Sequence, residues 1–161
     1  MNKLILAILL VGLSFSSQAQ KFTVPQLISL SKMNSDDMDT YLTNKGYSFY
    51  KGNDEEDNET KFYELQVPKT DKTYVLSYVK YKNENKKIKG FVTYQTNYKE
   101  EYLILKQQIK TLGYVYSYSE NQNENSSSLF FSKEEKSIEL QTTVSETETK
   151  TYKYFAVTVY F

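Results

Sequence analysis

A junction between a helix and a strand occurs twice in this chain, at positions 67 residues apart. The first copy reads Leu-Thr-Asn-Lys-Gly-Tyr-Ser-Phe around Gly46, and the second reads Ile-Lys-Thr-Leu-Gly-Tyr-Val-Tyr around Gly113. A polar segment, an aromatic strand and a final strand follow each copy. Recurrence of such a unit at a fixed offset strongly limits the folds that a chain can adopt. The sequence therefore predicts two similar halves, 22–96 and 97–161.

Hydrophobic periodicity predicts a helical segment followed by four strands in each half. The capping pairs Thr23 with Gln26 and Asn97 with Glu100 mark helix starts, and Gly46 and Gly113 mark helix ends. The predicted helices are 22–33, a short one beginning at Asn34 or Ser35, and 97–112. The predicted strands are 47–50, 61–67, 73–82, 87–95, 114–119, 129–132, 137–144 and 151–161. The segments 52–60 and 120–128 are expected to be polar loops.

Successive hairpins without crossover helices favour an α+β fold. We expect a tandem repeat of a helical segment plus four antiparallel strands, with the helices packed on one face of the sheet. This arrangement resembles that of secreted β-lactamase inhibitor proteins and of small outer-membrane assembly lipoproteins. The resemblance lies in predicted topology and transfers no functional residue, because a fold does not specify a function.

The first 19 residues have the pattern of a cleavable export signal. Lys3 supplies a positive start, 4–13 is apolar, and Ser17-Gln18-Ala19 ends in a small residue suited to cleavage. The alternative is a membrane anchor, but the apolar core is shorter than the roughly 20 residues that a spanning helix needs. The sequence thus predicts a signal peptide at 1–19, one globular domain at 20–161, and a periplasmic or secreted location.

Composition argues against several classes of function. The chain has no Cys, and it has no His, Trp or Arg. The usual ligands of zinc, copper and haem are therefore missing, and so are the residues of thiol- and histidine-based catalysis. The formal net charge is zero, which gives no general attraction for nucleic acid. We therefore predict no cofactor, no metal and no nucleic-acid partner.

Two charged segments allow alternative interpretations. The acidic run 53–59 could bind calcium through clustered oxygens, or it could be a solvated hairpin loop. A group of lysines around one turn could meet an anionic partner, or it could protect exposed strands from pairing with other chains. These lysines are Lys80, Lys82, Lys86, Lys87 and Lys89.

The aromatic strands provide the strongest candidate site. In 152–161, alternate residues should meet the helices, while the other set should lie on the opposite face of the sheet. A tyrosine-rich sheet face without helix cover can be a recognition surface, since tyrosine provides contact area together with a hydrogen bond. The alternatives are that tyrosines only fill strands, or that the two halves bury this face against each other. The predicted site residues are Tyr152, Tyr154, Tyr160, Phe91 and Tyr81.

Three functions remain in consideration. The preferred one is a non-catalytic binding module that recognises a protein or an envelope component through the aromatic face. The second is a structural or assembly protein that uses the same face as an interface between copies of the chain. The third is a carboxylate-dependent hydrolase, which would need two carboxyl groups facing each other across a groove.

Overall fold

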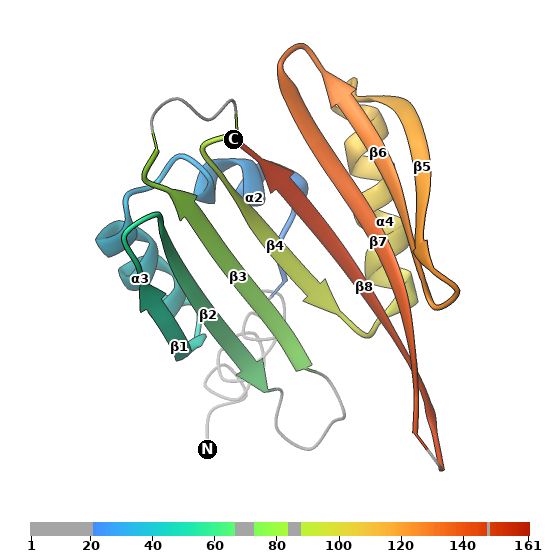
Figure 1. Ribbon diagram of the computed structural model, residues 1–161, viewed down its shortest axis with the longest axis horizontal. Coiled ribbons are helices and arrows are strands. Elements are labelled where there is room, and N and C mark those ends of the chain that lie inside the picture. Colours follow the sequence, from blue (N-terminus) through green and yellow to red (C-terminus); the bar gives the residue numbers. More distant parts are fainter. Residues whose placement is uncertain (1–20, 67–72, 84–87, 148) are drawn as a thin grey trace, which may run out of the picture.

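One antiparallel sheet of eight strands dominates the structure, a computed structural model that describes residues 21–66, 73–83, 88–147 and 149–161 (Figure 1). Three helices of the described residues contact this sheet, which confirms the α+β class. The predicted signal peptide, 1–19, lies outside the described residues. The helices are α2 (Val24–Leu30), α3 (Ser35–Asn44) and α4 (Lys99–Thr111). The strands are β1 (Ser48–Asp54), β2 (Asn58–Gln66), β3 (Thr73–Tyr81), β4 (Gly90–Thr96), β5 (Val115–Asn123), β6 (Ser126–Lys133), β7 (Lys136–Glu146) and β8 (Thr151–Tyr160).

The strand order is β1-β2-β3-β4-β8-β7-β6-β5. Each group of four consecutive strands is a meander, and the two groups meet where β4 pairs with β8. In that pairing Val92 lies opposite Val159, and Thr93 lies opposite Thr158. The two groups therefore extend one sheet rather than stacking as two layers, and β1 and β5 become its edges.

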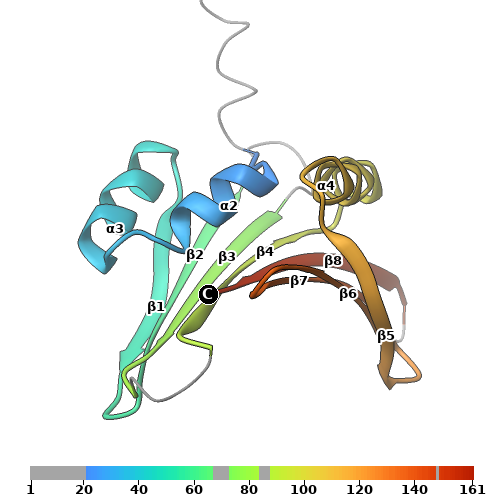
Figure 2. The same ribbon diagram turned by 90° about the horizontal axis from the view of Figure 1, so that it is seen from above.

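The helices all lie on one side of the sheet. Figure 2 shows α2, α3 and α4 above the sheet, which curves away from them so that its other face is concave. Helix α2 packs on β4, α3 packs on β1, and α4 packs on β4 and β8. No helix of the described residues covers the concave face (Figure 2). This arrangement agrees with the prediction that the helices share one face.

The core between helices and sheet is rich in tyrosine. Burial alternates along β4, and its buried residues Val92, Tyr94 and Thr96 face the helices. The largest fully buried side chains include four tyrosines, Tyr63, Tyr74, Tyr78 and Tyr94. A hydroxyl group in such a core needs a hydrogen-bond partner. Glu101 of α4 provides this partner for Tyr74, since one of its carboxylate oxygens accepts a hydrogen bond from the Tyr74 hydroxyl at 2.9 Å.

The helix ends follow local sequence signals at most positions. Thr23 and Gln26 form the predicted capping box at the start of α2, and the side chain of Asn34 caps α3. Gly46 and Gly113 have φ angles of +85° and +82°, in the left-handed region that favours glycine.

The capping box predicted at Asn97 is wrong. Helix α4 starts after Tyr98, and no side chain caps it at that residue. The hydroxyl of Thr96 instead accepts a hydrogen bond from the backbone N–H of Tyr98 at 3.1 Å, while it also donates to Glu101 at 3.2 Å. Thr96, the last residue of β4, therefore forms the side-chain hydrogen bonds that connect the strand with the start of α4.

The two predicted polar loops are also wrong. Strand β1 continues to Asp54 and β2 begins at Asn58, while β5 continues to Asn123 and β6 begins at Ser126. Every residue of β1 and of β5 is exposed. These strands lie at the sheet edges, so their pairing does not require the apolar alternation that marks a buried strand.

Because of the buried tyrosines, the free energy of unfolding should change with pH in the alkaline range. Burial, with a further contribution from the charge of Glu59, raises the pKa of Tyr78 to about 12 from its ordinary value of 10.0. Between pH 10 and about 12 the folded chain therefore binds more protons at this group than the unfolded chain does, so stability falls as pH rises. We expect Tyr78→Phe to reduce this loss by at most about 1.4 kcal/mol per pH unit.

Urea unfolding at several pH values above 9 checks this expectation. Tyr152→Phe is the matched control, since Tyr152 is 42% exposed. Equal slopes of unfolding free energy against pH for the wild type and Tyr78→Phe would contradict the assignment.

Candidate functional site

The concave face of the sheet, called the open face below, carries no charged side chain on its three central strands. Strands alternate their side chains between faces, and the register fixes which residues of β3, β4 and β8 point away from the helices. A quarter of the whole chain, 25%, is charged. Depletion of charge is typical of the centre of a protein interface. The open-face residues of these strands are Thr73, Val75, Ser77, Val79, Tyr81, Phe91, Thr93, Gln95, Tyr152, Tyr154, Ala156, Thr158 and Tyr160.

The five predicted site residues all lie on this face, but in two groups. The ring centroids of Tyr81 and Phe91 are 6.5 Å apart, and those of Phe91 and Tyr160 are 5.9 Å apart. At the other end of β8, the rings of Tyr152 and Tyr154 stack with centroids 6.4 Å apart. About 20 Å of strand separates Tyr154 from Tyr160. The structure thus brings three of the five residues into one row and leaves the other two as a separate pair.

A buried carboxylate stands beside the first group. Glu139 of β7 is only 7% exposed, and each of its oxygens accepts one hydroxyl hydrogen bond of 2.5 Å, from Ser128 and from Tyr160. Burial and the hydrogen bond to Glu139 raise the pKa of Tyr160 well above its ordinary value. Sequence reasoning missed Glu139, because a Glu between Ile138 and Leu140 has the alternation of a residue that faces water.

A second aromatic pair extends the row toward the β5 edge. Tyr118 and Phe130 stack with their ring centroids 4.4 Å apart. Between this pair and Tyr160 lies a depression of about 310 Å³, called the Tyr160 pocket below. The bulge between Tyr116 and Tyr118 shifts the register of β5, so simple alternation along the sequence did not predict this pair. The pocket is lined by Ile88, Ser117, Tyr118, Phe130, Phe131, Ser132, Ser137 and Tyr160.

Hydrogen bonds between strands hold the uncharged polar side chains of the open face. The amide nitrogen of Gln141 donates to Gln122 at 2.8 Å and to Ser126 at 3.1 Å. The hydroxyl oxygens of Thr93 and Thr158 are 2.9 Å apart across the β4–β8 pairing. Because these side chains hold one another in place, less conformational entropy is lost when they meet a partner.

Two glutamates of the described residues are buried, and they lie on opposite faces of the sheet. Glu101 belongs to the helix side, where its oxygens accept from Tyr74 and Thr96 and pair with Lys21 at 2.9 Å. Glu139 belongs to the open face. This pair therefore cannot face one groove, as a two-carboxylate hydrolase requires.

The acidic run 53–59 forms the β1–β2 hairpin turn and the adjoining strand ends. Lys82 pairs with Asp54 at 2.6 Å and donates to the carbonyl oxygen of Glu55 at 2.5 Å. Among the described residues, no group of three or more acidic side chains is placed to hold a metal ion. One lysine of the predicted lysine group thus stabilises the acidic turn, while Lys86 and Lys87 lie outside the described residues.

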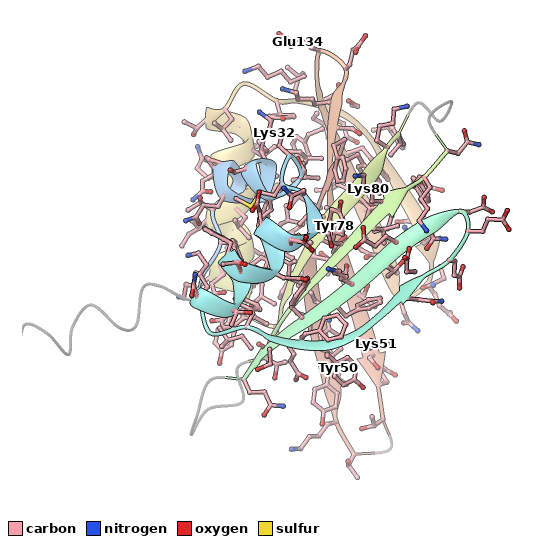
Figure 3. The ribbon with its side chains drawn as sticks, turned by 90° about the vertical axis from the view of Figure 1, so that its left-hand side faces the viewer. Lys32, Tyr50, Lys51, Tyr78, Lys80 and Glu134 are labelled. Atoms are coloured by element: carbon pink, nitrogen blue, oxygen red, sulfur yellow. The ribbon has the colours of Figure 1, made fainter. Side chains whose placement is uncertain are left out.

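A lysine–aromatic contact occurs at the β1 edge of the molecule. Figure 3 views the molecule from this edge and labels Tyr50 and Lys51 on β1. The ammonium nitrogen of Lys51 lies 4.9 Å from the ring centroid of Phe62 and 5.6 Å from that of Tyr50. These distances are those of cation–π contacts. An aromatic side chain of the sheet therefore already contacts a lysine of the same chain.

Comparisons of the chain with models of protein families, with curated proteins and with solved structures give no match. Across the part of the chain that the structure describes, no helix is long and apolar enough to cross a membrane. The function must therefore be inferred from the open face itself.

We expect Tyr160→Phe to lower the free energy of unfolding by about 1–2 kcal/mol. The change removes one of the two hydroxyl donors to Glu139 and leaves a buried carboxylate oxygen without that hydrogen bond. Tyr152→Phe is the control, because this exposed tyrosine should change stability by less than about 0.5 kcal/mol. Urea denaturation of the three proteins measures the difference, and equal effects of the two changes would contradict the role of Glu139.

Proposed function

We propose that the protein is a non-catalytic binding module, exported to the periplasm or beyond the cell, that recognises a protein or an envelope component through its open face. The observation that carries the proposal is the uncharged surface of β3, β4 and β8, flanked by aromatic groups at both ends of β8. Ala156 and Thr158 of this surface are buried, and most of its other side chains are half-buried. Depletion of charged residues with enrichment of aromatic ones is typical of the centre of a protein interface.

The form of the open face supports contact with a macromolecule. The face is concave and extends over the strands of one continuous sheet (Figure 2). Its aromatic side chains differ in exposure: Tyr152 and Tyr118 are 42% and 53% exposed, while Phe91 and Tyr160 are half-buried. Tyrosine and phenylalanine are enriched at protein interfaces, and half-buried rings are already fixed before a partner arrives.

We also infer that the two groups of four strands are copies of one unit. Each is a meander that follows a helix ending at a glycine with positive φ, Gly46 or Gly113. The charged and aromatic features are not shared equally between the copies. The acidic turn belongs to the first group, whereas Glu139 and the Tyr160 pocket belong mainly to the second. The proposed function therefore rests on what distinguishes the copies.

A capture experiment tests the proposal. The triple variant Phe91→Ser, Tyr152→Ser and Tyr154→Ser removes three rings of the open face and leaves the hydrogen bonds to Glu139 intact. We expect the immobilised wild type to retain a specific component of a cell-envelope extract, and the triple variant to retain at least about tenfold less. Circular dichroism should show the same fold in both proteins.

The matched control carries Leu103→Ser and Ile104→Ser on α4, where these side chains are 50% and 58% exposed on the other side of the sheet. It should capture as the wild type does. The proposal fails if the wild type captures nothing or if the triple variant captures equally. A wild-type dimer in light scattering that becomes a monomer in the triple variant would support the assembly function instead.

A further inference from the structure

The Tyr160 pocket has aromatic walls, and the buried carboxylate of Glu139 lies behind one of them, where it accepts the hydroxyl hydrogen bond of Tyr160. We infer that the pocket accepts a primary ammonium group, the side chain of a lysine on a protein partner; this inference rests on the proposed function and specifies the partner of the open face. No ion pair among the described residues involves Glu139.

Two hydroxyl groups hold the carboxylate of Glu139. Both of its oxygens accept from hydroxyl groups, and a carboxylate in its ionised form is an acceptor only. Two hydroxyl groups stabilise a buried charge much less than a cation does. Tyr160 connects Glu139 with the pocket, because its hydroxyl donates to Glu139 and its side chain lines the pocket.

The pocket walls match the two parts of a lysine side chain. The aromatic residues Tyr118, Phe130 and Tyr160 line the pocket, and aromatic rings attract an ammonium group. Ser117, Ser132 and Ser137 line the same pocket, and a hydroxyl oxygen can accept an N–H group even where, as between Ser117 and Ser132, two hydroxyls lie 2.7 Å apart. Ile88, which is 43% exposed, provides apolar contact for the methylene groups.

Size and hydrogen bonding distinguish lysine from other occupants. The volume of about 310 Å³ lies at the lower end of the range for small-ligand sites, so it fits one side chain rather than an extended polymer. A quaternary ammonium group has no N–H with which to use the serine hydroxyls. A neutral sugar would gain nothing from the charge of Glu139. The lysine must also be presented by a convex surface, because the open face around the pocket is concave (Figure 2).

A titration followed by nuclear magnetic resonance tests the inference. The probe is n-butylammonium, which reproduces the end of a lysine side chain, added to the purified protein. We expect saturable shifts of the backbone amide signals of Phe130, Ser132 and Tyr160, with a Kd on the order of 1–10 mM. Glu139→Gln keeps the side-chain shape and should weaken binding about fivefold or more. Tyr118→Ser, a change at an exposed wall, should weaken binding about threefold.

Glu146→Gln is the matched control, because it removes the same charge from the exposed far end of β7. It should bind the probe as the wild type does. Absence of saturable shifts would overturn the inference, and so would equal affinity in Glu139→Gln. Glucose or tetramethylammonium binding as tightly as n-butylammonium would also overturn it. Partner capture that depends on the open face, without n-butylammonium binding, would reject the lysine inference alone and leave the proposed function standing.

Discussion

The pairing of β4 with β8 is the interaction on which the rest of the structure depends. It is the only pairing that joins the two groups of four strands among the described residues, from Phe91 opposite Tyr160 to Thr96 opposite Phe155. On the helix side it buries Val92 beside Val159 and completes the core under α2 and α4. On the other side it aligns Phe91 with Tyr160. A slip of one residue would exchange these faces, so one register sets both the core and the candidate site.

Because the helices cover only one face of the sheet, the two faces use their tyrosines and buried glutamates in different ways. The helix side uses tyrosines as large core residues, and Glu101 accepts the hydroxyl hydrogen bond of Tyr74. The open face holds its rings half-exposed, and Glu139 accepts the hydroxyl hydrogen bond of Tyr160. The same pair of residue types thus serves stability on one face and, in our proposal, recognition on the other. The difference is access: a packed helix covers the first pair, whereas a pocket of about 310 Å³ adjoins the second.

Sequence reasoning succeeded where a local rule determines the structure. The capping box at Thr23, the glycine stops at Gly46 and Gly113, and the face alternation of β8 each depend on neighbouring residues only. Sequence reasoning failed where the structure of a segment depends on residues far away in the sequence. The edge strands β1 and β5 continue through polar segments because β2 and β6 pair with them. Burial of Glu139 depends on Tyr160, 21 residues away, and no local pattern contains that contact. The sequence likewise could not predict how the two halves pair. One extended sheet and two stacked sheets both agree with the same alternation of side chains along the strands.

An engineered disulfide across the β4–β8 pairing tests the account most directly. The chain has no cysteine, so any intramolecular disulfide in a Thr93→Cys, Thr158→Cys variant must join these two positions. The hydroxyl oxygens of Thr93 and Thr158 are 2.9 Å apart, which places two thiols within bonding reach. We predict that mild oxidation of the monomer forms this bond nearly completely, seen as loss of two hydrogens in the mass spectrum, whereas the Thr93→Cys, Val159→Cys control stays reduced because its side chains lie on opposite faces. A folded Thr93→Cys, Thr158→Cys monomer that remains reduced, or equal bonding in the control, would contradict the single sheet and its open face.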